Sequence, residues 1–256
     1  MDTRTLRILL VQPPETDGVR NLFPQQEDDK GGIGYKPPLG LLSLATVLRD
    51  WGGHDVELLD CLPLHLTPAE AAREIVRRAP DVVGISSWTE MWYPAHELGR
   101  LVKEQLPGCA LIYGGPHASI YPEETLAAEH VDAVVAGDGE RPLLAYCDAL
   151  ANGREPRHPG LHTKARGYDA EAPRWAEKRL AELPVPSRDF IDLADYGSVL
   201  ATAATGGSST MITSRGCPHK CVFCKVHAQN TVCDAVGPYT DPDTYNQANS
   251  QRIYDS

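Results

Sequence analysis

No stretch of the sequence is apolar for long enough to cross a membrane. A transmembrane helix needs about 20 consecutive apolar residues, and the hydrophobic run near the N-terminus, LRILLV, is much shorter. No small-residue cleavage site follows that run, as one would in a secretory signal peptide. The sequence therefore predicts a cytoplasmic protein without a membrane anchor, whose thiols are reduced and unpaired.

Clusters of basic residues are also missing. The chain has 24 Lys and Arg against 35 Asp and Glu, a formal net charge of −11, and the basic residues are scattered. A general nucleic-acid surface needs clustered Lys and Arg, so we expect no nucleic-acid partner. Hydrophobic residues make up 42% of the 256 residues, which is ordinary for a globular protein with a sizeable core.

The common nucleotide-binding motifs are absent as well. GGIGYK (31–36) lacks the third glycine of a dinucleotide fingerprint and does not directly follow a strand. No phosphate-binding P-loop occurs. GDGE (137–140) is compatible with a metal or phosphate turn, but a tight turn after a strand is the better expectation.

Residues 5–152 alternate between short β-branched or leucine-rich runs and helical patterns. Strands are predicted at 6–12, 54–60, 81–87, 109–115 and 131–137. Helices are predicted at 38–53, 67–79, 90–106, 122–129 and 140–151. Thr67 is expected to cap the second of these helices, with Pro68 at its first position.

The expected strands are apolar on both faces, which predicts an α/β fold with a parallel sheet covered on both sides. We expect a flavodoxin- or Rossmann-like five-stranded sheet with the order 2-1-3-4-5. Ligands of such sheets bind at the carboxyl ends of the strands, where the strand order reverses. A ligand site is therefore expected in the loops after Gln12, Ser87 and Gly115.

The second half of the chain differs in character. Residues 153–208 are rich in Pro, Gly and polar groups, and we expect a linker with little fixed structure. STMITSRG (209–216) is predicted to form one more strand, which leads into a cysteine cluster. The expected organisation is an α/β domain at 1–152, the linker, and a further domain that begins at 209–256.

Three cysteines follow that strand in the order Cys217-Pro-His-Lys-Cys221-Val-Phe-Cys224. Thiolates at this spacing can converge on one metal centre from a short loop. Three such ligands would bind three irons of a four-iron, four-sulfur cluster and leave the fourth iron open to another ligand. The motif is therefore a candidate iron–sulfur site.

Structural zinc is the alternative, and it requires four ligands. Cys233, His219 and His227 are available as a fourth ligand. Zinc knuckles favour a two-residue gap in each of two pairs, however, and only one such gap is present, so the iron–sulfur interpretation is favoured and Cys233 is not expected to be a ligand. The other cysteines are expected to be small buried hydrophobes; they are Cys61, Cys109 and Cys147.

TSRGCPHKCVFC resembles the signature of the radical S-adenosylmethionine (SAM) family. The resemblance implies that the open iron chelates the amino and carboxylate groups of SAM, and that an electron from the cluster cleaves SAM to a 5′-deoxyadenosyl radical. It places Phe223 where the family's chain passes the adenine of SAM. It also implies a reducing partner such as flavodoxin or ferredoxin.

The first half resembles the cobalamin-binding domain of class B radical SAM enzymes. The matching stretches are YKPPLGLLSLATVLRDWGGHDVELLD, PDVVGISS, YGGPHAS and VDAVVAGDGERP. The resemblance implies that the cobalamin tail enters the carboxyl edge of the sheet. Gly114 and Gly115 would let the backbone approach the ligand closely, and hydroxyl groups would come from Ser86, Ser87 and Thr89.

One departure concerns the cobalt ligand. Cobalamin-dependent mutases carry Asp-x-His-x-x-Gly after the first strand, whereas the corresponding loop here contains no histidine. We therefore expect no lower cobalt ligand from that motif, and expect His117 to line the ligand edge. The aromatic group Trp88, Trp92 and Tyr93 either packs on the corrin ring or forms a partly buried helix start.

The resemblance implies a cobalamin-dependent methyltransferase in which methylcobalamin donates a methyl group to a carbon or phosphorus centre of a small-molecule substrate. Two alternatives stay open: a cobalamin-binding module without catalysis, and a methylthiotransferase with a second cluster on Cys61, Cys109 and Cys147. A complete barrel needs about 200 residues, yet only residues 225–256 follow the motif. We therefore expect a shortened form of a longer enzyme, and no catalytic residue is assigned.

Overall fold

The structure is a computed structural model, and it describes residues 4–16, 35–172, 174–196, 210–212 and 215. Its centre is one six-stranded sheet with the order β2-β1-β3-β4-β5-β6. The strands are β1 (Arg7–Gln12), β2 (Asp55–Asp60), β3 (Val82–Ser86), β4 (Ala110–Gly114), β5 (Ala133–Val135) and β6 (Leu161–Thr163). The first five pair in parallel, and β6 pairs antiparallel to β5.

The helices that connect these strands cover the sheet on both faces, as parallel crossovers require. They are α2 (Leu39–Asp50), α3 (Pro68–Arg78), α4 (Trp92–Gln105), α5 (Gly115–Ile120), α6 (Pro122–Ala127) and α7 (Glu140–Ala151). Short 3₁₀ turns occupy Thr89–Met91, Leu180–Glu182 and Leu193–Asp195. Within the described ranges no helix combines the length and the apolar character that crossing a bilayer would require.

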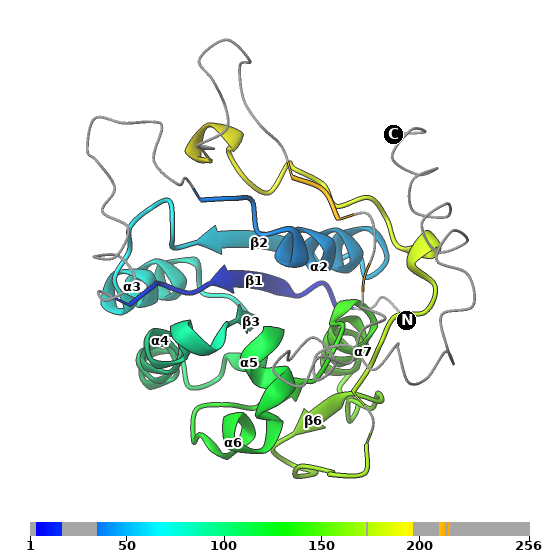
Figure 1. Ribbon diagram of the computed structural model, residues 1–256. Coiled ribbons are helices and arrows are strands. Elements are labelled where there is room, and N and C mark those ends of the chain that lie inside the picture. The colour runs from blue at the N-terminus through cyan, green and yellow to red at the C-terminus, as the bar shows by residue number, and fades with distance from the viewer. Residues whose placement is uncertain (1–3, 17–34, 173, 197–209, 213–214, 216–256) are drawn as a thin grey trace, which may run out of the picture.

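Two hydrophobic cores lie on opposite faces of the sheet. One core packs α3, α4, α5 and α6 against side chains such as Leu9, Val11 and Tyr113. The other packs α2 and α7 against side chains such as Leu10 and Ile112. In Figure 1, α3 and α4 accordingly lie at the left and α2 and α7 at the right. Successive strand residues alternate between the two cores, and for this reason the strands read as continuous apolar runs.

The predicted five-stranded α/β sheet and its order are confirmed, and β6 extends it. This sixth strand lies in the predicted 153–208 linker, and Trp175 of the same segment bridges to Gly137. The expectation of little fixed structure is thus wrong for these residues, because the backbone of β6 pairs with β5 and that of Trp175 pairs with Gly137. The predicted strand at 209–216 is not seen either: of its described residues, 210–212 and 215, none lies in a strand.

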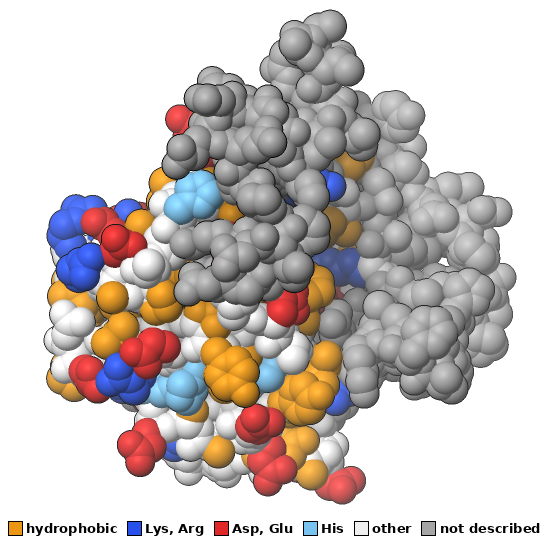
Figure 2. Space-filling model, turned by 60° about the vertical axis from the view of Figure 1, so that its left-hand side comes forward, with side chains coloured by type: hydrophobic (Ala, Val, Ile, Leu, Met, Phe, Trp, Pro, Cys, Tyr) orange, Lys and Arg blue, Asp and Glu red, His pale blue; other side chains and the backbone are white. Residues whose placement is uncertain are grey.

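Charged side chains are mixed on the molecular surface. On the face shown in Figure 2, Lys and Arg side chains lie beside Asp and Glu, and His side chains lie among hydrophobic ones. Within the described part of that face there is no continuous basic area. This agrees with the scattered basic residues in the sequence.

The N-terminus of α3 is fixed by a reciprocal capping box. The Thr67 hydroxyl accepts a hydrogen bond from the Glu70 backbone amide, and the Glu70 carboxylate accepts one from the Thr67 amide at 2.9 Å. Pro68 occupies the first turn, where no amide donor is needed. Both sequence predictions for this helix start are confirmed.

Replacing Thr67→Ala should lower the free energy of unfolding by about 1 kcal/mol, because loss of the hydroxyl leaves the Glu70 amide without its acceptor. Thr67→Ser keeps the hydroxyl and should stay close to the wild type. Urea denaturation followed by far-UV circular dichroism measures both values. Equal stability of all three proteins would show that the capping box contributes nothing.

Asp60 ends β2 as a buried carboxylate. It accepts hydrogen bonds from the Leu62 amide at 3.1 Å and the Tyr196 hydroxyl at 2.9 Å. Burial is the largest influence and raises the pKa of Asp60 from 3.8 to about 6, although both hydrogen bonds oppose it. The folded protein therefore holds this proton more tightly than the unfolded chain does.

The free energy of unfolding should therefore fall as pH rises from about 4 to about 6, and it should stay at its lower value above pH 6. Asp60→Asn removes the charge, and it should raise the free energy of unfolding at pH 8 by about 2 kcal/mol and flatten the profile between pH 4 and 6. Urea titrations across this range measure the effect. Asp55→Asn, at the exposed start of the same strand, is the control; an unchanged slope in Asp60→Asn would contradict the assignment.

Candidate functional site

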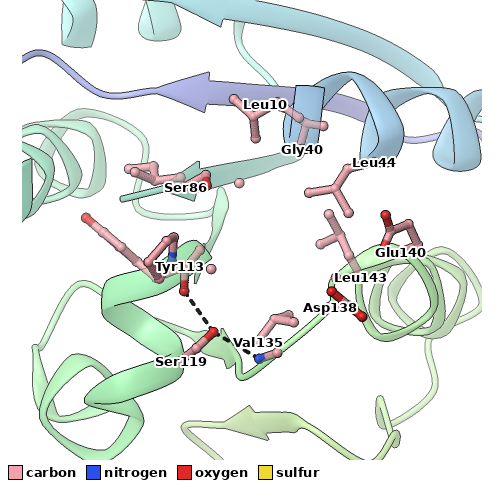
Figure 3. Close-up of a pocket in the computed structure, with 18 of the residues that line it drawn as sticks. Leu10, Gly40, Leu44, Ser86, Tyr113, Ser119, Val135, Asp138, Glu140 and Leu143 are labelled. Atoms are coloured by element: carbon pink, nitrogen blue, oxygen red, sulfur yellow. Dashed lines mark hydrogen bonds between the residues drawn. The ribbon is translucent and has the colours of Figure 1, made fainter. Parts of the chain in front are cut away.

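A cavity of about 420 Å³ lies between the carboxyl half of the sheet and the helices α2 and α7. Figure 3 shows its walls, with Leu10 and Ser86 from the strands facing Leu44 and Leu143 from the helices. Its remaining lining includes Gly40, Leu41, Gly84, Trp88, Ile112, Gly114, Gly115, Pro116, Ser119, Val135, Asp138, Glu140, Ile212 and Arg215. It opens at the sheet edge that the sequence predicted to bind a ligand.

The cavity exists because two strand positions on this face have no side chain. Gly84 pairs with Leu10 on one side and with Ile112 on the other, so a gap lies between two large residues. One pleat further on, Ser86 pairs with Gly114. A Cβ added at Gly84 would lie 2.8 Å from the Leu10 side chain, whereas one added at Gly114 would meet only Val135 at 4.0 Å.

The turn after β4 requires glycine. Gly115 has a φ of +84°, and a Cβ there would lie 2.7 Å from Ser86 Oγ and 3.1 Å from the Ser87 backbone. The chain can turn directly from β4 into α5 only if this residue has no side chain. The close approach brings the Ser86 hydroxyl to the cavity, and no described residue hydrogen-bonds it.

Ser119 joins two strand ends across the lower part of the cavity. Its hydroxyl donates to the Gly115 carbonyl at 2.8 Å and accepts from the Gly137 amide at 3.0 Å, as the dashed lines in Figure 3 show. Both bonds are internal to the protein. Ser119 therefore fixes the loops after β4 and β5 relative to each other.

Charged residues occupy the wall beside α7. Arg215 lies 3.3 Å from an Asp138 oxygen and 2.6 Å from a Glu140 oxygen, and the Ser43 hydroxyl donates to Glu140 at 2.7 Å. The Glu140 side chain is only 3% exposed. Removing one partner of a buried pair costs about 3–5 kcal/mol, because the remaining charge lacks both water and a counter-ion.

These two carboxylates respond differently to their surroundings. Burial would raise the pKa of Glu140, but the charge and hydrogen bonds of Arg215 together with the Ser43 hydrogen bond lower it overall. Burial raises the pKa of Asp138, and the charge of Arg215 only partly offsets this. Glu140 is therefore the firmer of the two ionic partners of Arg215.

The predicted ligand residues divide between the two faces of the sheet. Ser86, Gly114 and Gly115 line the cavity. Ser87 is fully buried and is not part of the lining. Thr89 and His117 also lie outside the lining; Thr89 begins the 3₁₀ turn after β3, and His117 lies in α5 after β4.

His117 belongs to a packed aromatic group, not to the cavity wall. Its ring stacks on Trp92 with centroids 4.3 Å apart, and its Nδ1 lies 3.4 Å from the Thr89 hydroxyl. Burial lowers the pKa of His117 and keeps it neutral near pH 7. The aromatic group was expected either to pack on the corrin ring or to form a partly buried helix start. Trp88 lines the cavity, while Trp92 packs against the core at the start of α4 and Tyr93 is exposed.

The predicted cysteine positions fall into two groups: those outside the described residues and those in the hydrophobic cores. Cys217, Cys221, Cys224 and Phe223 lie outside the described residues. Cys61, Cys109 and Cys147 are free and buried, as predicted. Cys61 and Cys109 belong to one core and Cys147 to the other, so the sheet separates them. Burial raises the pKa of all three thiols, that of Cys109 to about 11.

Sequence comparison relates this fold to known proteins. The model of the B12 binding domain family matches residues 34–146. An uncharacterized methyltransferase of Pyrococcus horikoshii is 35% identical over 88% of this chain and 46% of its own length. The anaerobic magnesium-protoporphyrin IX monomethyl ester cyclase of Synechocystis is 29% identical over 86% of this chain and 42% of its own. The cobalamin-dependent radical SAM methyltransferase TokK of Streptomyces tokunonensis is 29% identical over 57% and 22%, respectively.

Residues 34–146 thus match the B12 binding domain family, and the chain is similar over most of its length to part of a methyltransferase and over 57% of its length to part of a cobalamin-dependent radical SAM methyltransferase. A solved structure has the same fold: that of the radical SAM methyltransferase TsrM from Kitasatospora setae, with cobalamin and a [4Fe-4S] cluster bound. It superposes with a TM-score of 0.63 at 20% identity, over 88% of this chain and 43% of that one. The chain thus spans less than half the length of these relatives.

The cavity fits part of a cobalamin. Pockets of roughly 300–1,000 Å³ hold drug-sized groups, so a cavity of about 420 Å³ could hold part of a cobalamin molecule. The apolar walls suit a flat heterocycle, and the Ser86 hydroxyl could donate or accept one hydrogen bond there. No histidine is among the described residues that line it.

Several lining residues were not singled out from the sequence. Gly84 could have been found, since it precedes Ser86 by two positions in VVGIS and therefore shares its face. Ser119 lies in α5, a short helix in the segment after Gly115 that was expected to be a loop. The contact of Arg215 with residues near α7 has no local sequence signal, because 75 positions separate it from Glu140.

Gly114→Leu should weaken cobalamin binding by about tenfold or more, since its side chain would fill the cavity. The backbone at Gly114 is extended and its Cβ position is open, so the fold should tolerate the change. Titration with hydroxocobalamin followed by visible absorption measures affinity. Gly108→Leu, at an exposed glycine with open space, is the control; equal affinity of both variants would exclude this cavity as the site.

Proposed function

We propose that this chain forms the cobalamin-binding part of a cobalamin-dependent radical SAM enzyme that transfers a methyl group to a carbon or phosphorus centre of a small molecule. The observation that carries the proposal is the cavity at the carboxyl edge of a B12-binding fold. The wall of this cavity includes Arg215, only two residues before Cys217 of the cysteine motif. One polypeptide thus carries candidate sites for both cofactors.

The residues of the chain have separate roles in this proposal. Gly84 and Gly114 leave room for the buried end of cobalamin, and Ser86 offers it a hydroxyl group. Cys217, Cys221 and Cys224 hold three irons of a [4Fe–4S] cluster, which leaves the fourth iron open for SAM, with Phe223 beside the adenine. Methylcobalamin, when bound, supplies the methyl group.

Methyl transfer is favoured over other radical chemistry by the names of two relatives, both described as methyltransferases. A third relative is a cyclase that acts on magnesium-protoporphyrin IX monomethyl ester. The substrate in the name of this cyclase is a small molecule, and we propose a substrate of that class. Reducing equivalents would come from a small electron carrier such as flavodoxin or ferredoxin.

A methylthiotransferase would need Cys61, Cys109 and Cys147 to hold a second cluster. These thiols lie in cores on opposite faces of the sheet. No group of metal-binding side chains occurs within the part of the chain that the structure describes. The buried positions of the three cysteines therefore argue against this alternative.

Anaerobic reconstitution with iron and sulfide tests the radical SAM assignment. The wild-type chain should bind about four irons per chain and release 5′-deoxyadenosine from SAM after reduction. Cys221→Ala should lower the iron content and abolish SAM cleavage, because one cluster ligand is removed. Its cobalamin affinity should stay unchanged, since the cavity is intact.

The control is Cys147→Ala, which removes a core thiol and should leave the iron content unchanged. A wild-type chain that binds cobalamin and a cluster but forms no deoxyadenosine would favour the non-catalytic binding module. A wild-type chain that binds about eight irons would instead support the methylthiotransferase.

A further inference from the structure

Three described residues before the cysteine motif contact other parts of the structure, and two of them, Ile212 and Arg215, line the cavity. The Thr210 carbonyl accepts a hydrogen bond from the Arg188 guanidinium at 2.5 Å. The side chain of Ile212 lines the cavity. Arg215 binds the two acidic side chains on the wall beside α7. These contacts hold the segment along the cavity.

The acidic partners of Arg215 have their own supports. Glu140 begins α7 and accepts a hydrogen bond from Ser43 of α2 at 2.7 Å. Asp138 accepts one from the Glu177 backbone amide at 2.9 Å. Because neither support involves Arg215, the two carboxylates form a preorganised receptor for its guanidinium. The planar guanidinium can donate to both carboxylates at once, which a lysine cannot reproduce.

Arg215 is also covalently close to the cluster ligands. Two residues of chain span at most about 7 Å, so the Cα atom of Cys217 cannot lie further than this from that of Arg215. Any constraint on the position of Arg215 is passed to the first cysteine of the motif. The distance between the motif and the cavity is therefore limited by this ionic contact.

We propose that Arg215 is a positioning residue: its ion pairs with Asp138 and Glu140 fix the start of the cysteine motif beside the cavity and so set the distance between the iron–sulfur cluster and cobalamin. The inference rests on the proposed function, because it requires both cofactors in one chain. An arginine with a structural role alone would contribute to stability without controlling that distance.

The distance between the cofactors can be measured by electron paramagnetic resonance. Cob(II)alamin and a reduced [4Fe–4S] cluster both carry unpaired electrons, and their dipolar coupling falls with the cube of the distance. The full chain, reconstituted anaerobically and saturated with cobalamin, should show a cob(II)alamin signal broadened by the cluster. Arg215→Met should lose this broadening although both cofactors are still bound, and Arg215→Lys should show a partial loss.

Arg141→Met is the matched control. Arg141 lies on α7, is as buried as Arg215, and pairs with Glu177 and Glu182 instead of the segment before the motif. It should keep the wild-type broadening. If Arg215→Met keeps the broadening, or Arg141→Met loses it equally, the positioning role is wrong.

A second variant covers the case in which Arg215→Met does not fold. Glu140→Gln removes the charge of one receptor group and keeps its shape, and it should also reduce the broadening; an unchanged signal would overturn the inference. A wild-type chain that fails to bind either cofactor would overturn the proposed function and this inference with it. That outcome appears before any substitution, so the two failures are distinguishable.

Discussion

The register of β3 between β1 and β4 is the constraint on which the rest of the site depends. It sets Leu10, Gly84 and Ile112 side by side in one row, and Ser86 beside Gly114 in the next. A slip of one residue would direct Ile85 and Tyr113 into the same space and fill it. The floor of the cavity is thus a product of strand pairing, and residues after the strands, such as Trp88 and Asp138, complete its walls.

The two faces of the sheet are packed differently. The face with α3 and α4 is closed by large side chains, and the ring stack of Trp92 and His117 continues that packing to the carboxyl edge. The face with α2 and α7 is closed near the amino ends of the strands but open near their carboxyl ends. Close packing on the face with α3 and α4 holds the strands in register, although the face with α2 and α7 contains the cavity.

Much of this organisation could be predicted from the sequence, because buried parallel strands leave continuous apolar runs and helix caps leave local patterns, as at Thr67. The three-residue strand β6 could not, since Leu161–Thr163 are surrounded by Pro and Gly and gain their structure only by pairing with β5. Ser86 and Gly114, the last residues of β3 and β4, line the cavity at the edge where the sequence predicts a ligand site. His117, which was expected to line the ligand edge, stacks on Trp92 outside the cavity, because α5 begins directly at Gly115 and no sequence pattern marks that helix start.

The three buried thiols have a consequence for how this protein tolerates oxygen. Cys61, Cys109 and Cys147 are enclosed in two cores separated by the sheet, and burial disfavours their thiolate forms. Thiol–disulfide exchange and oxidation proceed through the thiolate, so these residues cannot cross-link with one another while the domain is folded. Exposure to air would therefore not form disulfides among these three cysteines as long as the α/β domain stays folded.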